Sequence, residues 1–311
     1  MSTRQLSLLL LLASLWGASF LFIRVGVAEF GVAPLMLLRV GFGALFLLGL
    51  ALVRLGPGAV WRTLRRHAWP LLVCGLLNSA APFCLFAFAE LTLQAGTTSV
   101  INATAPLWAA LVAYLWLGER LSAPRTLGLV IGFAGVLLLV GDQMFAPAGA
   151  TGGASASATL LAAAAALGAT LLYGIAANYT KRKLSGVDPL LNATGTMTGA
   201  TLLLTPFALA SWPAAPASAQ AWGAVVALGI LCTGVAYLIF FYLIAKVGPS
   251  RAITVTFVIP IFGILWGALF LDEVVAPMML AGCAVVLLGT ALATGAIKRI
   301  PGFGAARDRL G

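Results

Sequence analysis

The chain has 311 residues, of which 62% are hydrophobic and 8% charged, and its mean hydropathy is +1.08. Soluble domains carry about 25% charged residues, so this composition indicates a chain that lies in a lipid bilayer. The net charge of +10 is spread over single cations and small clusters between apolar runs, and no basic domain or arm is available to bind a nucleic acid.

The first apolar run follows Arg4 and is rich in leucine, as in a secretory signal peptide. It continues to Ala28, which favours a retained membrane-spanning helix. Windows of about 20 apolar residues recur along the rest of the chain. The ten windows cover residues 6–28, 34–54, 69–90, 95–117, 125–142, 159–180, 189–211, 220–245, 250–271 and 277–297. They predict an all-α membrane protein with ten transmembrane helices.

A stretch rich in Ala, Gly and Ser follows the fifth window, near the middle of the chain. This composition is typical of a flexible linker. The expected organisation is a five-helix unit at 1–145, a linker at 146–158, a second five-helix unit at 159–297 and a cytoplasmic tail at 298–311.

The two units repeat one another at an offset close to 154 residues. Pro106 and Glu119 in the fourth window have counterparts in Pro260 and Glu273 in the ninth. Because each unit has an odd number of spans, the second unit must enter the membrane upside down. The sequence therefore predicts two inverted repeats, which can exchange conformations and open one central site to either side of the membrane.

The positive charges test this topology independently. With both termini in the cytoplasm, all but two of the 18 Lys and Arg residues fall on the cytoplasmic side, and the exceptions are Arg24 and Arg39. The loop between windows 2 and 3 carries four arginines, whereas its counterpart between windows 7 and 8 carries none. The same loop differs in charge because it lies on opposite faces of the membrane.

The four cysteines lie in apolar runs without the spacing of a metal site: Cys74, Cys84, Cys232 and Cys283. Two of them, Cys74 and Cys84, would lie about 15 Å apart on one helix, too far for a disulfide. We expect all four to be small core residues, and the sequence predicts neither a metal nor a cofactor.

Several segments resemble the EamA module, which defines the ten-helix branch of the drug/metabolite transporter superfamily. They are "LLLASLWGASFLFIRVGV" near the start, "LLRVGFGALFLL" in the second window, residues 97–140, and residues 250–293 in the second half. Within that branch the sequence is most similar to YddG-type amino-acid exporters. The resemblance implies a basket of two inverted halves, with helices 1, 3, 4, 6, 8 and 9 around a central cavity. It also implies export of amino acids or similar metabolites across the inner membrane of a bacterium.

Each repeated proline removes a helix hydrogen bond in mid-membrane and frees a carbonyl. Recurrence favours a pair of hinges at Pro106 and Pro260 beside the cavity, and two ordinary kinks are the alternative.

Glu119 and Glu273 end their windows where a carboxylate faces the negative end of the helix dipole. The N-terminus of the next helix is close enough to offset this cost, so we interpret both as anchors of tight hairpins and not as proton carriers.

Polar side chains inside the apolar windows are the candidates for contact with a substrate. Asn78 and Asn102 are amides that need partners, either on a neighbouring helix or on the substrate. Ser99, Asn102 and Pro106 share one helix face, and Thr256 marks the same face in the second repeat. We therefore predict a polar stripe that faces the cavity.

Aromatic side chains could line the same cavity, although aromatic residues in membrane helices more often serve packing or the lipid interface. The candidates are Trp16, Phe83, Trp108, Tyr173, Tyr237 and Trp266; Trp16 and Tyr173 are favoured because they are repeat-equivalents.

Arg39 lies about 7–8 Å into the second window. An intramembrane cation is usually paired or functional, so Arg39 either pairs with Glu90 or Glu29 or binds the carboxylate of a substrate.

No catalytic constellation is visible, and the one histidine, His67, lies in a basic loop, so we do not expect an enzyme. Inverted repeats with unlike polar residues suit a carrier better than a channel, and a non-transporting scaffold is the remaining alternative. We predict an alternating-access exporter of aromatic or other neutral amino acids or related metabolites, with drugs or nucleosides as alternative solutes. Its partners would be this small-molecule substrate and the lipid bilayer. The sequence leaves the energy coupling open, and also the oligomeric state, a monomer included.

Overall fold

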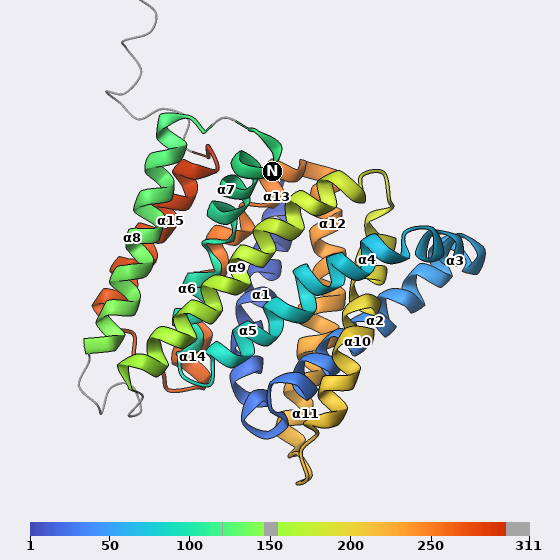
Figure 1. Cartoon of the computed structure of the whole chain (residues 1–311), viewed down its shortest axis with the longest axis horizontal. Helices are drawn as coiled ribbons and strands as arrows, with labels where there is room; N and C mark the ends of the chain where they lie inside the picture. The colour runs from blue at the N-terminus through green and yellow to red at the C-terminus, as the bar shows by residue number, and fades with distance from the viewer. Residues whose placement is uncertain (120, 146–154, 297–311) are drawn as a thin grey trace, which may run out of the picture.

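The computed structural model describes residues 1–119, 121–145 and 155–296, and this part of the chain is helical, without β-strands. Figure 1 shows a bundle of tilted helices in which the N-terminus lies at the same end as α7 and α13. The α-helices are α1 (Thr3–Phe30), α2 (Val32–Leu55), α3 (Pro57–Arg66), α4 (Ala68–Gly75), α5 (Ala81–Ala89), α6 (Ala95–Asn102), α7 (Ala105–Leu117), α8 (Ala123–Phe145), α9 (Ala156–Lys183), α10 (Pro189–Ala210), α11 (Ala219–Val226), α12 (Ala236–Val247), α13 (Pro249–Ala252), α14 (Val255–Phe270) and α15 (Pro277–Ala293). Two π-helical segments, η1 (Leu76–Ala80) and η2 (Ala227–Val235), complete the set.

Helices occupy all ten apolar windows of the sequence. Within the described ranges, seven helical segments are long and apolar enough to cross a membrane, and α14 and α15 are shorter apolar helices. A helix satisfies its own backbone hydrogen bonds, which is why long apolar runs adopt it in lipid. The protein is therefore a multi-pass membrane protein, whereas ten crossings with both termini in the cytoplasm stay a prediction.

Four of the windows hold interrupted helices. η1 joins α4 to α5 and η2 joins α11 to α12, at positions that match under the repeat offset. A turn separates α6 from α7, and another separates α13 from α14. Hydropathy predicted none of these interruptions. It also missed α3, a short helix in the basic loop whose three arginines and exposed Trp61 suit a membrane surface.

The predicted linker and tail lie largely outside the described residues. Of the linker at 146–158, residues 146–154 are not described, and α9 begins at Ala156. The predicted tail at 298–311 also lies outside the described chain.

Helices of one repeat pack on helices of the other in matched pairs. α1 packs against α14, and its counterpart α9 packs against α6 and α7. α2 packs against η2, and its counterpart α10 packs against α4 and η1. The pairs α2–α10 and α8–α15 bring helices against their own counterparts. This pattern is the one expected of two inverted repeats related by a pseudo-two-fold axis.

Glycines allow the closest of these approaches. A Cβ on Gly17 of α1 would lie 2.6 Å from the Phe262 Cβ in α14. A Cβ on Gly174 of α9 would lie 2.7 Å from the carbonyl carbon of Trp108 in α7. The two glycines are repeat-equivalents, so the same small residue holds the same pair of helices together in both halves.

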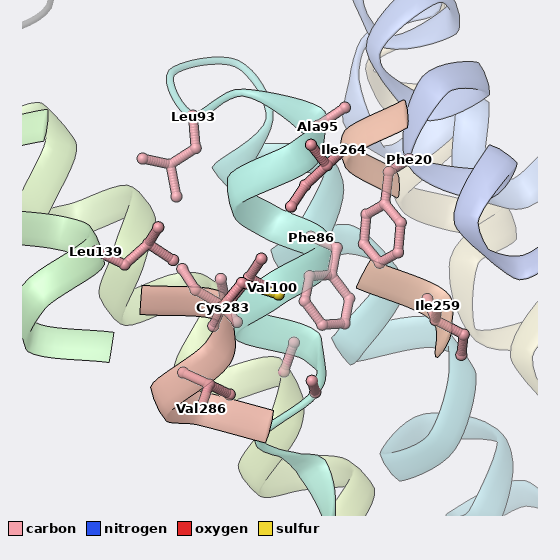
Figure 2. Packing of buried hydrophobic residues seen from close by; sticks show 14 of the residues in the cluster. Phe20, Phe86, Leu93, Ala95, Val100, Leu139, Ile259, Ile264, Cys283 and Val286 are labelled. Atoms are coloured by element: carbon pink, nitrogen blue, oxygen red, sulfur yellow. The ribbon is translucent and has the colours of Figure 1, made fainter. Parts of the chain in front are cut away.

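Two clusters of buried apolar side chains result. Figure 2 shows side chains of α1, α5, α6, α8, α14 and α15 converging in one of them, which we call the first core. Phe20 and Phe86 meet there edge to face, with ring centroids 5.9 Å apart. The second core contains side chains of α2, α10 and η2, such as Met36, Met197 and Leu228.

Candidate functional site

A cavity of about 310 Å³ lies where the two cores meet, at the lower end of the range for small-molecule sites. Phe20 and Ile259 of the first core line it, as do Phe83 and Cys232 of the second. The other lining residues are Trp16, Ser19, Ile23, Arg39, Asn78, Phe86, Asn102, Ala105, Tyr173, Thr233, Tyr237, Phe240, Ile253 and Thr256. Both repeats therefore contribute to one central site.

Arg39 of α2 is the one charged side chain among the described residues that line the cavity. Its guanidinium lies over the ring of Phe83, 3.7 Å from the centroid, and its Nε donates a hydrogen bond to Thr233 Oγ1 at 3.4 Å. The side chain is 7% exposed. Since a guanidinium has five N–H donors, donors remain for an anionic group on a bound solute.

Neither of the ion pairs offered as one alternative for Arg39 is present in the described chain, and its role as a partner for a substrate carboxylate stays a prediction. Glu29 instead accepts hydrogen bonds from the backbone N and the Oγ of Ser218 at 2.6 and 2.7 Å. Glu90 is fully buried, and its carboxylate oxygens have no hydrogen-bond partner in the described chain, while Arg24 donates to its backbone oxygen. Sequence spacing could not decide this, because the rotation of each helix determines which neighbour a side chain meets.

The two π-helical segments place polar groups at matched positions of the cavity wall. Asn78 lies in η1, and its counterpart at an offset of 154 is Cys232 in η2, next to Thr233. Asn78 Nδ2 donates to Tyr237 Oη at 3.5 Å, so this amide reaches a partner in the other repeat. π-helical turns occur frequently at functional sites, and here they supply three lining residues.

Residues beside the breaks of the two broken helices also line the cavity. Asn102 is the last residue of α6, and its counterpart at an offset of 154, Thr256, lies in the first turn of α14. Hydroxyl groups satisfy carbonyls beside each break. Thr104 Oγ1 donates to the Ile101 carbonyl at 2.7 Å, and Thr256 Oγ1 donates to the Ile253 carbonyl at 2.8 Å.

Aromatic rings form the apolar part of the wall. Trp16 lies between Tyr237 and Phe240, with ring centroids 6.4 and 5.2 Å away. Phe86 and Tyr173 lie 5.8 Å apart. Tilted and edge-to-face contacts of this kind stabilise one another beyond the area that they bury, so the wall is held in a defined shape around the polar groups.

Seven of the eight residues predicted to contact the substrate line this cavity: Trp16, Asn78, Phe83, Asn102, Tyr173, Tyr237 and Thr256. Ser99 is not among the lining residues. It is fully buried, its Oγ donates to the Gly96 carbonyl at 2.7 Å, and it packs on Gly263 of α14. Trp108 and Trp266 are also outside the lining. The close contact between α6 and α14 turns the Ser99 side of α6 toward packing.

Sequence reasoning missed ten lining residues, of which three carry a hydroxyl or thiol group: Ser19, Cys232 and Thr233. The repeat offset would have identified Cys232 as the counterpart of Asn78, but its residue type suggested a core position. All four cysteines are free, and three are buried. In the described ranges, no group of three His, Cys, Asp or Glu side chains is placed to hold a metal ion.

The two repeated prolines occupy different helical positions. Pro106 lies at the start of α7, directly after the break, whereas Pro260 lies in the interior of α14. A proline at a helix start replaces a donor that is unpaired anyway, while an interior proline removes a hydrogen bond. Their role as paired hinges stays a prediction.

Glu273 joins α14 to the start of α6. Its carboxylate accepts hydrogen bonds from the backbone N of Ala95 at 2.6 Å and of Gly96 at 3.0 Å. A carboxylate at a helix N-terminus is stabilised both by these bonds and by the helix dipole. The sequence suggested the next helix, α15, as the source of these donors. That detail is wrong, because the tight packing of α6 on α14 brings the N-terminus of α6 closer.

Glu119 ends α7 in the same backbone conformation but has another partner. The backbone N–H groups of Glu119 and Glu273 donate to the carbonyls of Ala113 and Gly267, again 154 residues apart, at 3.3 and 3.2 Å. The Glu119 carboxylate accepts a hydrogen bond from Lys181 Nζ at 2.9 Å, and this bond, with the charge of Lys181, lowers the pKa of Glu119. One loop therefore contacts the backbone N–H groups at the start of α6, whereas its counterpart contacts a lysine side chain in the last turn of α9.

A multi-pass helical fold with two repeats around a small polar and aromatic cavity is an architecture of membrane transporters. The model of the EamA-like transporter family matches residues 4–141 and 160–295. The chain belongs to this family, which confirms the resemblance seen in the sequence.

Individual relatives agree with this assignment. The uncharacterized transporter YoaV of Bacillus subtilis is 24% identical over 237 residues, which cover 76% of this chain and 78% of YoaV. A probable terminal-alkyne amino-acid exporter of Streptantibioticus cattleyicolor is 27% identical over 277 residues, 89% of each chain. A solved crystal structure with 21% identity superimposes over 96% of this chain and 99% of its own, with a TM-score of 0.64, and it supports the fold alone.

Proposed function

We propose that this transporter exports amino acids with apolar or otherwise neutral side chains, or closely related metabolites, across a bacterial inner membrane by alternating access. The position of Arg39 carries the proposal. A single cation, held by Phe83 and Thr233 in a cavity of aromatic and uncharged polar groups, suits a solute with one carboxylate on a largely apolar body. The 27% identical relative is named a probable amino-acid exporter, which supports the same substrate class.

The proposed mechanism treats residues 1–145 and 159–297 as the two repeats, with ten crossings and both termini in the cytoplasm. The Glu273 contact then lies on the outer face, where it joins α14 to α6. Near the opposite face, Ile253 lines both the central cavity and a second cavity of about 760 Å³ that reaches Arg125 and Thr294. These features support an assignment of the structure to an inward-facing state.

Uptake into liposomes tests the function. Purified protein should move radiolabelled neutral amino acids with saturation and counterflow, and the panel should be run with and without a pH gradient to reveal coupling. Arg39→Gln should abolish most of this flux, while Arg24→Gln serves as the matched control because Arg24 is a membrane cation outside the cavity lining. Flux of drugs or nucleosides alone would favour the alternative substrates, and no flux of any solute would favour a scaffold.

A further inference from the structure

At two repeat-equivalent residues of the cavity lining, the backbone carbonyl lacks the usual helix donor. Asn102 and Thr256 both line the cavity, and a proline follows each of them four residues later, at Pro106 and Pro260. In a continuous helix, the N–H at that position donates to the carbonyl four residues earlier. Inside α14, Pro260 has no N–H to donate to the Thr256 carbonyl. The Asn102 carbonyl lacks a helix donor for another reason, because α6 ends at Asn102 and the last carbonyls of a helix have no intrahelical partner.

Neighbouring carbonyls at the first break have donors of their own. Thr104 Oγ1 donates to the Ile101 carbonyl at 2.7 Å, and Thr290 Oγ1 of α15 donates to the Ala103 carbonyl at 3.0 Å. The Asn102 carbonyl lies between them at the C-terminal end of α6, where the helix dipole is negative. Freed carbonyls and helix C-termini bind cations in transporters with broken helices.

The two sides of the cavity differ in electrostatic character. Arg39 lies on α2 beside residues of the second core, whereas Asn102 and Thr256 lie beside Ile101 and Val255 of the first core. No Asp or Glu occurs among the described lining residues. A cationic group in this cavity therefore has carbonyl and amide oxygens as its available partners.

We propose that the carbonyls of Asn102 and Thr256, with the side-chain oxygen of Asn102, form a subsite for the ammonium group of the substrate. This inference rests on the proposed function, in which Arg39 takes the carboxylate. The substrate is then an α-amino acid with a free ammonium group. Its carboxylate lies beside the second core and its ammonium group beside the first. A monovalent coupling ion such as Na⁺ would use the same oxygen chemistry, so the experiment must separate the two.

The test compares phenylalanine with 3-phenylpropionate, which lacks the ammonium group, in liposome uptake. Pro260→Ala restores an N–H inside α14 that competes for the Thr256 carbonyl, and Pro106→Ala adds an N–H directly after the break that follows Asn102. Loss of one charge-assisted hydrogen bond should raise the KM for phenylalanine about tenfold relative to that for 3-phenylpropionate. Pro206→Ala is the matched control, since Pro206 lies inside α10 and outside the cavity lining. Asn102→Asp should act in the opposite direction, because it adds a carboxylate to the subsite.

The possible results are distinguishable. Wild-type protein that moves neither amino acids nor the analogue contradicts the proposed function and the subsite with it. Wild-type transport of phenylalanine, with an unchanged ratio of the two KM values in the proline variants and in Asn102→Asp, overturns the subsite alone. A sodium requirement that weakens in the variants, again without a change in that ratio, would assign the carbonyls to a coupling ion and overturn the ammonium assignment.

Discussion

Replacing Glu273 by glutamine removes the charge from the contact that joins α14 to the N-terminus of α6. Glutamine keeps the length of the side chain and one acceptor oxygen, but its amide nitrogen cannot accept the second of the two backbone N–H groups. The contact joins the two repeats through the backbone of α6, and the equivalent residue Glu119 bonds the Lys181 side chain instead. We therefore expect the substitution to destabilise the conformation seen here relative to the one in which the face with the Glu273 contact opens.

The magnitude follows from the two hydrogen bonds, at 2.6 and 3.0 Å. A hydrogen bond to a charged group contributes about 1.5–3 kcal/mol, and the interaction of a charge with a helix terminus adds about 0.3–1 kcal/mol. Allowing for the acceptor that glutamine retains, the conformational equilibrium should shift by about 2 kcal/mol. That shift corresponds to a population of the open conformation about 30-fold larger.

Thiol labelling can measure this population. In a background without Cys74, Cys84, Cys232 and Cys283, a cysteine at Leu93 reports the closed face, because Leu93 is 1% exposed. A cysteine at Ile253, which is 42% exposed, reports the opposite face. A membrane-impermeant maleimide should react with the Leu93→Cys thiol up to about 30-fold faster when Glu273→Gln is present.

Asp272→Asn is the matched control, because Asp272 lies in the same loop, is exposed and is not a partner of α6. It removes the same charge without touching the helix contact and should leave both labelling rates unchanged. If Glu273→Gln behaves like Asp272→Asn, the contact does not hold this face closed, and the reasoning from the helix terminus fails.

Three further predictions concern the cavity. Arg39→Gln should reduce amino-acid uptake at least tenfold while leaving the amount of folded protein in the membrane unchanged, and full retention of uptake would contradict a role in substrate binding. Asn102→Ala should lower transport without loss of folded protein; unchanged kinetics in both Asn102→Ala and Asn78→Ala would remove the asparagines from the site. Pro106→Ala and Pro260→Ala should shift thiol labelling at the two mouths in opposite directions, whereas parallel shifts would make the prolines simple kinks.

The helices were predictable because a long apolar segment in lipid must satisfy its own backbone hydrogen bonds, as a helix does. All ten windows hold helices. The repeat offset was equally informative, since it paired Trp16 with Tyr173 and placed Asn102 and Thr256 in equivalent positions. Both signals, hydropathy and the repeat offset, depend only on the order of the residues and not on how each helix is rotated.

The sequence did not show which way each side chain faces, because this depends on the rotation of each helix and on the register of its backbone. Ser99 faces α14, and Arg39 lies over Phe83, although the spacing in the sequence also allowed a cavity-facing serine and an ion pair. Helices that are apolar on all sides give no periodic signal for their buried face. The π-helical segments change the register within a helix without changing its hydropathy, so hydropathy could not indicate that η2 places Thr233 at the cavity.

The matched packing between the repeats bears on how the protein folds. α1, α2 and α8 each bury a face against helices of the second repeat, including α14, α10 and α15. A polypeptide that ended after α8 would leave these close-packing glycine faces without a partner. We therefore expect the two repeats to fold as one cooperative unit, with the first half of the chain kept competent for assembly until the second half has been inserted into the membrane.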